Sequence, residues 1–313
     1  MGRPRQTRRL DWALVFVATL MLDSCSRTAA PPETRIEPAL EKLIPGDTVV
    51  LAGVRVTLVE SSPVYARLMK GRMFPELDQF AQQTGLDPRR DLKEVLLASN
   101  GSRAVVIAKG RVEDVSKLEA LLESKGAQRF RVGPHTLLGN EQAAVCFLSN
   151  SVAIAGQTSA LRDLLSGQSG KDENKKQVLA QVALIPSGTP IWMVAVAGFS
   201  PMRLPEQGNL ANLQRVFQSL ETALVALDLR EGVRLSAQGV CKDEPGAKQL
   251  HNALRGLIGF GRLSTPADHA ELLRFYDSIK VEQNKTEIKL QVDVPMDMVD
   301  QFLKATEKDK PSV

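Results

Sequence analysis

Leu43-Ile44-Pro45-Gly46-Asp47-Thr48 runs directly into the apolar segment Val49-Val50-Leu51-Ala52-Gly53-Val54. A similar stretch, Leu184-Ile185-Pro186-Ser187-Gly188-Thr189, precedes Ile191-Trp192-Met193-Val194-Ala195-Val196. In each place a proline and a glycine stop a helix-like run and force a turn before an apolar strand. The recurrence predicts two diverged copies of one α/β unit, each opening at this stretch.

Hairpins dominate both copies. The clearest pairs residues 94–99 with 103–108 across Asn100-Gly101, a dipeptide that tolerates the positive φ angles of a type I′ turn. The second copy repeats the order with strands over 223–229 and 233–240. We therefore expect an α+β fold with largely antiparallel sheets and helices packed on one face. Strands with continuous apolar runs, such as 191–196, are expected at the centre.

The chain divides into six predicted segments. These are a signal peptide over 1–25, a tether over 26–37, a first α/β unit over 38–165, a linker over 166–173, a second α/β unit over 174–305 and a charged tail over 306–313. The linker is rich in Gly and Ser and follows a predicted helix. The alternative is a single domain in which the strands of both copies join one continuous sheet.

The N-terminus has the pattern of an export signal. A basic region, Arg3 to Arg9, precedes an apolar run over 12–22 that is too short to cross a bilayer, which takes about 20 residues. Leu22-Asp23-Ser24-Cys25 then resembles a bacterial lipobox, although Asp23 stands where a small uncharged residue is usual. We expect lipidation of Cys25, with plain cleavage or an uncleaved anchor as alternatives. The expected location is the cell envelope, as a periplasm-facing lipoprotein or a secreted protein.

Charge and composition argue against a nucleic-acid partner. The net charge is +4, but residues 1–25 carry four arginines and two aspartates, which leaves the remainder near +2. Binding to nucleic acid needs a concentrated basic face. Aromatic residues make up only 4% of the chain, so stacking platforms for bases or sugars are scarce. The membrane, through a lipid anchor, and another envelope protein are the expected partners.

Two cysteines remain beyond Cys25. Cys146 and Cys241 could form a disulfide in an oxidising envelope. Each lies in or beside an apolar strand, however, and a buried cysteine often acts as a small hydrophobic residue. Both interpretations stay open at this stage.

No catalytic, cofactor-binding or metal-binding motif occurs in the sequence. The three histidines, His135, His251 and His269, are far apart and form no ligand spacing. Residues 167–171 lack the first glycine of a phosphate loop, and Asp172 follows the lysine. Residues 256–261 end a predicted helix instead of following a strand, so they do not form a dinucleotide loop. We therefore assign no catalytic residue, no cofactor and no metal.

Two apolar features bear on binding. The segment 198–208 carries Phe199, Met202 and Leu204, which form a candidate partner surface or fold back over the core. A second group stands around the first two predicted helices of the first unit. Its members could line a groove for lipid or hydrophobic peptide, or simply pack helix on sheet: Met69, Met73, Phe74 and Phe80.

The order of motifs in the first unit resembles a class of uncharacterised bacterial secreted proteins and lipoproteins. The resemblance rests on the lipobox-like leader, the short tether, the Leu43–Thr48 stretch, and Thr84-Gly85-Leu86-Asp87-Pro88 with Asp91-Leu92 before a hairpin. It implies an exported α/β protein and brings no catalytic residue with it.

These patterns together favour a non-catalytic, membrane-tethered envelope protein that acts by binding, scaffolding or assembly. Two alternatives remain. One is an envelope hydrolase whose site forms only in three dimensions, and the other is a carrier of lipid or hydrophobic peptide.

Overall fold

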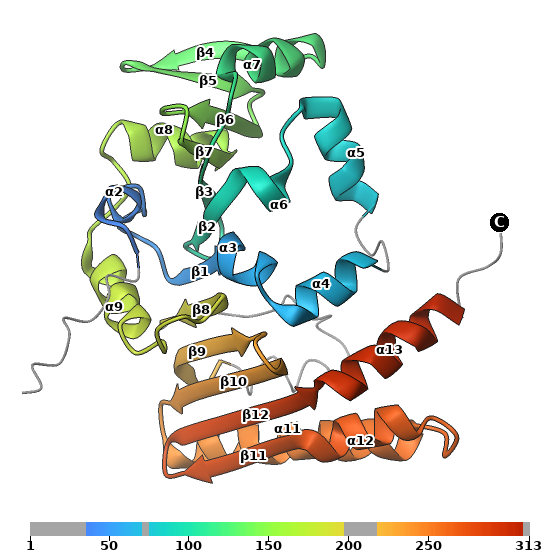
Figure 1. The fold of residues 1–313 in the computed structure, drawn as a ribbon. Coiled ribbons are helices and arrows are strands. Elements are labelled where there is room, and N and C mark those ends of the chain that lie inside the picture. Colours follow the sequence, from blue (N-terminus) through green and yellow to red (C-terminus); the bar gives the residue numbers. More distant parts are fainter. Residues whose placement is uncertain (1–35, 71–74, 197–217, 309–313) are drawn as a thin grey trace, which may run out of the picture. The chain divides into compact units, whose positions relative to one another are not determined.

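The computed structural model describes residues 36–70, 75–196 and 218–308 (Figure 1). The described strands form one 12-stranded sheet in the order β11-β12-β10-β9-β8-β1-β2-β3-β7-β6-β5-β4. Every described strand pair is antiparallel. The predicted α+β class with a largely antiparallel sheet is confirmed. The predicted signal peptide, most of the tether and the end of the charged tail lie outside the described residues.

The first half of the chain supplies seven strands. Its elements are α2 (Pro38–Glu41), β1 (Val50–Arg55), α3 (Val56–Glu60), α4 (Pro63–Lys70), α5 (Pro75–Thr84), α6 (Pro88–Asp91), β2 (Leu92–Ser99), β3 (Ala104–Gly110), α7 (Val115–Ser124), β4 (Gln128–Val132), β5 (His135–Gly139), β6 (Ala143–Phe147), β7 (Val152–Gln157) and α8 (Thr158–Leu165).

The second half supplies the other five described strands. Its elements are α9 (Glu173–Val182), β8 (Ile191–Ala195), β9 (Leu220–Asp228), β10 (Gly232–Cys241), α11 (Glu244–Ser264), α12 (Ala270–Ser278), β11 (Ile279–Asn284), β12 (Glu287–Pro295) and α13 (Met296–Lys308).

The two halves share the sheet through the β1–β8 pair. Outward from this pair the order is β1-β2-β3-β7-β6 on one side and β8-β9-β10-β12-β11 on the other. The continuous sheet is thus the arrangement observed, and the described residues from Ile36 onward form one compact unit. Residues 166–173 connect α8 to α9 inside that unit, where the backbone N–H of Asp47 donates to the Ser169 carbonyl at 3.1 Å. The apolar runs of β8, β1, β2 and β3 lie in the middle of the sheet, as predicted.

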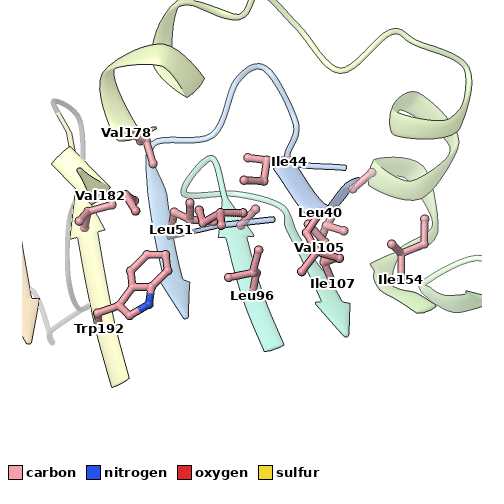
Figure 2. Close-up of a cluster of buried hydrophobic side chains, with 14 of the residues drawn as sticks. Leu40, Ile44, Leu51, Leu96, Val105, Ile107, Ile154, Val178, Val182 and Trp192 are labelled. Carbon is pink, nitrogen blue, oxygen red and sulfur yellow. The ribbon is translucent and has the colours of Figure 1, made fainter. Parts of the chain in front are cut away.

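One face of the sheet, called the core face here, is covered by α2, α8 and α9. Side chains alternate along a strand, so Leu51, Leu96, Ile107 and Trp192 point to the same side. Figure 2 shows them among side chains such as Leu40 and Val178 from the covering helices. Each of these six side chains is at most 3% exposed. This cluster is the largest hydrophobic core of the described chain.

The opposite face, called the cavity face here, carries the other set of alternating side chains. A row of directly paired residues crosses it from β6 to β9: Val145, Ala155, Val106, Leu97, Ala52, Met193 and Val225. Beyond β9, helices α11 to α13 pack on this face against Ile288 and Val294. Helices therefore lie on both faces of the sheet, in contrast to the single face expected from the sequence.

The repeated stretch has the same local structure in both halves. Thr48 Oγ1 donates to the Pro45 carbonyl at 2.7 Å, and Thr189 Oγ1 donates to the Pro186 carbonyl at 2.7 Å. The isoleucine before each proline is buried. The stretch is therefore a turn that fixes the entry of a central strand, and its recurrence reflects a structural requirement.

Candidate functional site

An apolar cavity of about 320 Å³ opens on the cavity face, between the sheet and helices α5 and α7. Its sheet wall comes from β3, β6 and β7: Val106, Ala108, Val145, Phe147, Ala153 and Ala155. Its helix wall comes from α5 and α7: Phe80, Leu118, Leu121 and Leu122. The size falls within the range of small-molecule sites. No titratable side chain lines this cavity among the described residues.

Small residues on two strands create the space. Ala108 on β3 pairs directly with Ala153 on β7, and Ala155 follows two residues later on the same face. The core face of the same strands carries the larger Ile107 and Ile154, both fully buried. The sheet is therefore filled on its core face and hollow on its cavity face.

The end of α5 is fixed by a short polar turn. Gly85 has φ +73°, and its backbone N–H donates to the Ala81 carbonyl at 2.8 Å, which closes the helix. Thr84 Oγ1 donates to the Phe80 carbonyl at 2.7 Å and accepts from the Leu86 N–H at 3.1 Å. These bonds hold Phe80 and Leu86 in the cavity wall.

The next residues of the same motif build α6 and the start of β2. Asp87 caps α6 by accepting from the Arg89 N–H at 3.1 Å, and its own N–H donates to Asp91 Oδ2 at 2.7 Å. The segment Thr84–Pro88 with Asp91-Leu92 thus places Leu86 and Leu92 in the cavity. The residues of this motif therefore have a structural role, which is to end α5, begin α6 and position the cavity wall.

Helix α7 closes the cavity from the other side. Asp114 caps it by accepting from the Lys117 N–H at 3.0 Å, which sets the rotation that turns Leu118 inward. Leu118 is 8% exposed. At the far end, Lys125 Nζ donates to Gln83 Oε1 at 2.9 Å and links α7 to α5.

A second, charged cleft of about 100 Å³ adjoins the apolar cavity. The two share four lining residues: Thr84, Leu86, Val112 and Leu118. The cleft adds six charged side chains: Arg90, Asp91, Arg111, Glu113, Asp114 and Lys117. Arg90 Nε lies 2.8 Å from Asp91 Oδ1, and this guanidinium holds the pKa of Asp91 below its ordinary value. An apolar space thus continues into a charged one.

The cysteines do not pair. Cys146 lies on β6 and Cys241 ends β10, and both are buried free thiols. Seven strand-to-strand steps separate β6 from β10. At about 4.8 Å per step, the two sulfurs are far beyond the reach of a disulfide. The candidate disulfide is wrong for this fold, because both thiols occupy separate apolar clusters.

The other predicted site residues divide into two groups. Cys25, Phe199, Met202, Leu204, Met73 and Phe74 lie outside the described residues. Phe80 lies in the cavity wall and is 43% exposed, while Met69 is half-buried on α4. One member of the predicted apolar group therefore lines a real cavity.

The histidines stand apart from the cavity. His135 begins β5, His251 lies on α11, and His269 precedes α12. Among the described residues, no three His, Cys, Asp or Glu side chains gather as a metal site requires. In the same residues, no helix combines the length and the apolarity needed to cross a membrane.

Sequence reasoning missed most of the cavity. Of the residues that line it, Phe80 alone was predicted as a possible groove residue. The available signal was the excess of alanine on one face of two adjacent apolar strands, opposite isoleucine on the other. Small side chains on a half-buried face leave volume that a bulky residue would fill.

Comparison with known proteins gives only distant likenesses. No family model matches the chain, and no curated protein does. Crystal form I of TP0453 matches 90% of this chain and 99% of its own, with 9% identity and a TM-score of 0.44. Crystal form III matches 87% and 98%, with 8% identity and a TM-score of 0.47. At these values the likeness has no bearing on ligand or activity.

Proposed function

We propose that this chain is a non-catalytic, membrane-tethered protein of the cell envelope that acts by binding an apolar ligand. The apolar cavity between α5, α7 and the sheet carries the proposal. A lining of mostly aliphatic and aromatic side chains, with the hydroxyls of Thr84 and Ser151 but no acid or base, is suited to holding a molecule and not to converting it. Among the alternatives considered, the cavity favours a carrier of lipid or hydrophobic peptide.

The cellular location is proposed from the leader. The basic region Arg3 to Arg9, the apolar run over 12–22 and Cys25 support export and lipid anchoring. Labelled palmitate supplied to a Gram-negative host is expected to label the wild type. The Cys25→Ser variant is expected to stay unlabelled and to leave the membrane fraction. Labelling of Cys25→Ser would contradict the lipid anchor.

The binding proposal is tested with an apolar fluorescent probe, N-phenyl-1-naphthylamine, on the full chain. Wild type is expected to bind the probe with a rise in fluorescence. Ala155→Phe places a ring in the cavity and should weaken binding by about tenfold or more, which corresponds to about 1.4 kcal/mol.

The matched control is Ala66→Phe, which adds the same ring at an exposed position of α4. It should leave probe affinity unchanged, and thermal melts should show that both variants are folded. Equal affinity of Ala155→Phe and wild type, or no binding by wild type, would overturn the proposed function.

A further inference from the structure

The charged cleft lies where one end of a ligand in the apolar cavity would emerge. The two spaces share Thr84, Leu86, Val112 and Leu118, so they form one continuous depression with an apolar and a charged part. An apolar molecule that fills the first part places its other end beside charged side chains. Arg111 and Lys117 are exposed at this end, so a polar or charged end of the ligand can contact them directly.

Some charged side chains of the cleft have partners within the protein, and others do not. Arg90 and Asp91 form an ion pair, and an Asp114 carboxylate oxygen accepts from the Lys117 N–H. In the described chain, no ion pair involves the side chains of Arg111 and Lys117. Among the described residues, Glu113 is the acid of the cleft with neither an ion pair nor a side-chain hydrogen bond, while Asp114 keeps its negative charge despite the bond from the Lys117 N–H. Arg111 and Lys117 are therefore the cations of the cleft that have no ion-pair partner in that part of the chain.

Arg111 is held close to the cavity by its backbone. Its N–H donates to the Asp91 carbonyl at 2.7 Å, and the N–H of Val112 donates to the Asn150 carbonyl at 2.8 Å. Val112 itself lines both spaces. The guanidinium therefore projects from a fixed point of the boundary between the apolar and the charged part.

We infer that the ligand is a single-chain amphiphile with an anionic head group. Its hydrocarbon chain occupies the apolar cavity, and its carboxylate or phosphate contacts Arg111 and Lys117. Arg presents a planar fork of donors that matches either oxyanion, and Lys adds a compact positive charge. A cavity of about 320 Å³ is near the lower end of the range for small-molecule sites, which favours one chain over two.

This inference rests on the proposed function and is tested with dodecanoate and monododecyl phosphate, each below its micelle concentration, and with dodecanol below its solubility limit. Displacement of the fluorescent probe reports the affinity of each. The anionic compounds are expected to bind about tenfold more tightly than dodecanol, and the tighter of the two identifies the head group. Added salt should weaken the binding of the two anionic compounds and leave the affinity for dodecanol unchanged.

Charge variants provide the decisive comparison. The double variant Arg111→Gln with Lys117→Gln should bind dodecanoate no better than dodecanol, while Glu113→Gln should strengthen dodecanoate binding. The matched control, Lys248→Gln with Arg255→Gln, removes the same two charges from the exposed side of α11 and should change neither affinity.

The outcomes separate the two claims. If dodecanol and the anions bind equally, or the double variant keeps the preference, the anionic head group is wrong and the apolar site stands. If neither dodecanol nor the probe binds, the proposed function itself fails.

Discussion

Gly53 and Trp192 face each other directly across the β1–β8 pair, and the indole occupies the space that a side chain at position 53 would need. A Cβ built on Gly53 would lie 2.3 Å from two carbons of the Trp192 ring. Trp192 is 3% exposed and belongs to the main core cluster. The pairing that joins the two halves of the chain therefore requires a glycine at position 53, because any side chain there would clash with Trp192.

The first prediction follows from that contact. Gly53→Ala should destabilise the protein by about 1–3 kcal/mol, because the core must shift to admit the methyl group. Urea unfolding measures the change. Combining it with Trp192→Leu should recover part of the loss, since the smaller side chain leaves room, and a double-mutant cycle would show this coupling. Strictly additive effects would contradict the contact.

Gly256 on α11 is the matched control. A Cβ there meets no atom within 4 Å, so Gly256→Ala should leave packing intact. Because alanine favours a helix interior, this variant is expected to be more stable by about 0.5–1 kcal/mol. Replacing glycine by alanine is thus expected to lower the free energy of unfolding at position 53 and to raise it at position 256.

The second prediction concerns the repeated turn. Thr48→Val removes the shorter of the two hydrogen bonds that this residue donates to the Pro45 carbonyl and leaves the one from its backbone N–H at 3.3 Å. The expected loss of stability is about 0.5–1.5 kcal/mol, measured by urea unfolding. Thr189→Val should cost less, because Pro186 is exposed and water can replace the hydroxyl at its carbonyl.

Thr48→Ser keeps the hydroxyl and serves as the control for this prediction. It should lose much less stability than Thr48→Val. A larger loss of stability for Thr48→Ser than for Thr48→Val would mean that the methyl group, and not the hydrogen bond, holds the turn.

Much of the fold could be predicted because local signals agreed with one another. The turns at Pro45 and Pro186, the Asn100-Gly101 hairpin and the apolar runs each act over a few residues. The single sheet was left as an alternative, because the pairing of Gly53 with Trp192 joins residues far apart in sequence. Nothing in either strand alone specifies that partner.

The cavity was harder to predict than the sheet. Phe80 drew notice because aromatic residues near helices can line a groove. The residues that make the space, Ala108, Ala153 and Ala155, are individually ordinary. Their effect arises only when β3 and β7 pair in register and α7 stops short of filling the gap. A cavity depends on how separate elements pack together, and the amino-acid composition of the chain carries no information about that packing.

The third prediction concerns Cys146 and Cys241. Because seven strand spacings separate their strands, the protein should contain no bond between them. Burial raises the pKa of both thiols, so each should react slowly with maleimide in the native state and quickly after unfolding without reductant. Peptide mapping by mass spectrometry tests this. A Cys146–Cys241 disulfide peptide would contradict the strand order itself.

The fourth prediction concerns Glu94 on β2. It stands between Arg55 and Lys109 in the strand register, and its Oε1 atom is buried without a hydrogen-bond partner. Burial raises the pKa of this carboxyl above its ordinary value of 4.5; the charges of Arg55 and Lys109 lower it, and that of Glu37 raises it. The native protein therefore keeps this proton to higher pH than the unfolded chain does.

The direction of the pH effect follows from that difference. Between the ordinary pKa and the raised native pKa, the native state binds more protons, so this group lowers the free energy of unfolding as pH rises. Glu94→Gln removes the charge and should be more stable than wild type at pH 7, with the advantage disappearing below about pH 4. Urea unfolding at both pH values measures this difference in stability.

The matched control is Glu282→Gln, on the exposed side of β11, which should change stability by less than about 0.5 kcal/mol at either pH. A Glu94→Gln effect that is the same at both pH values would mean that packing, and not ionisation, sets the cost of this side chain.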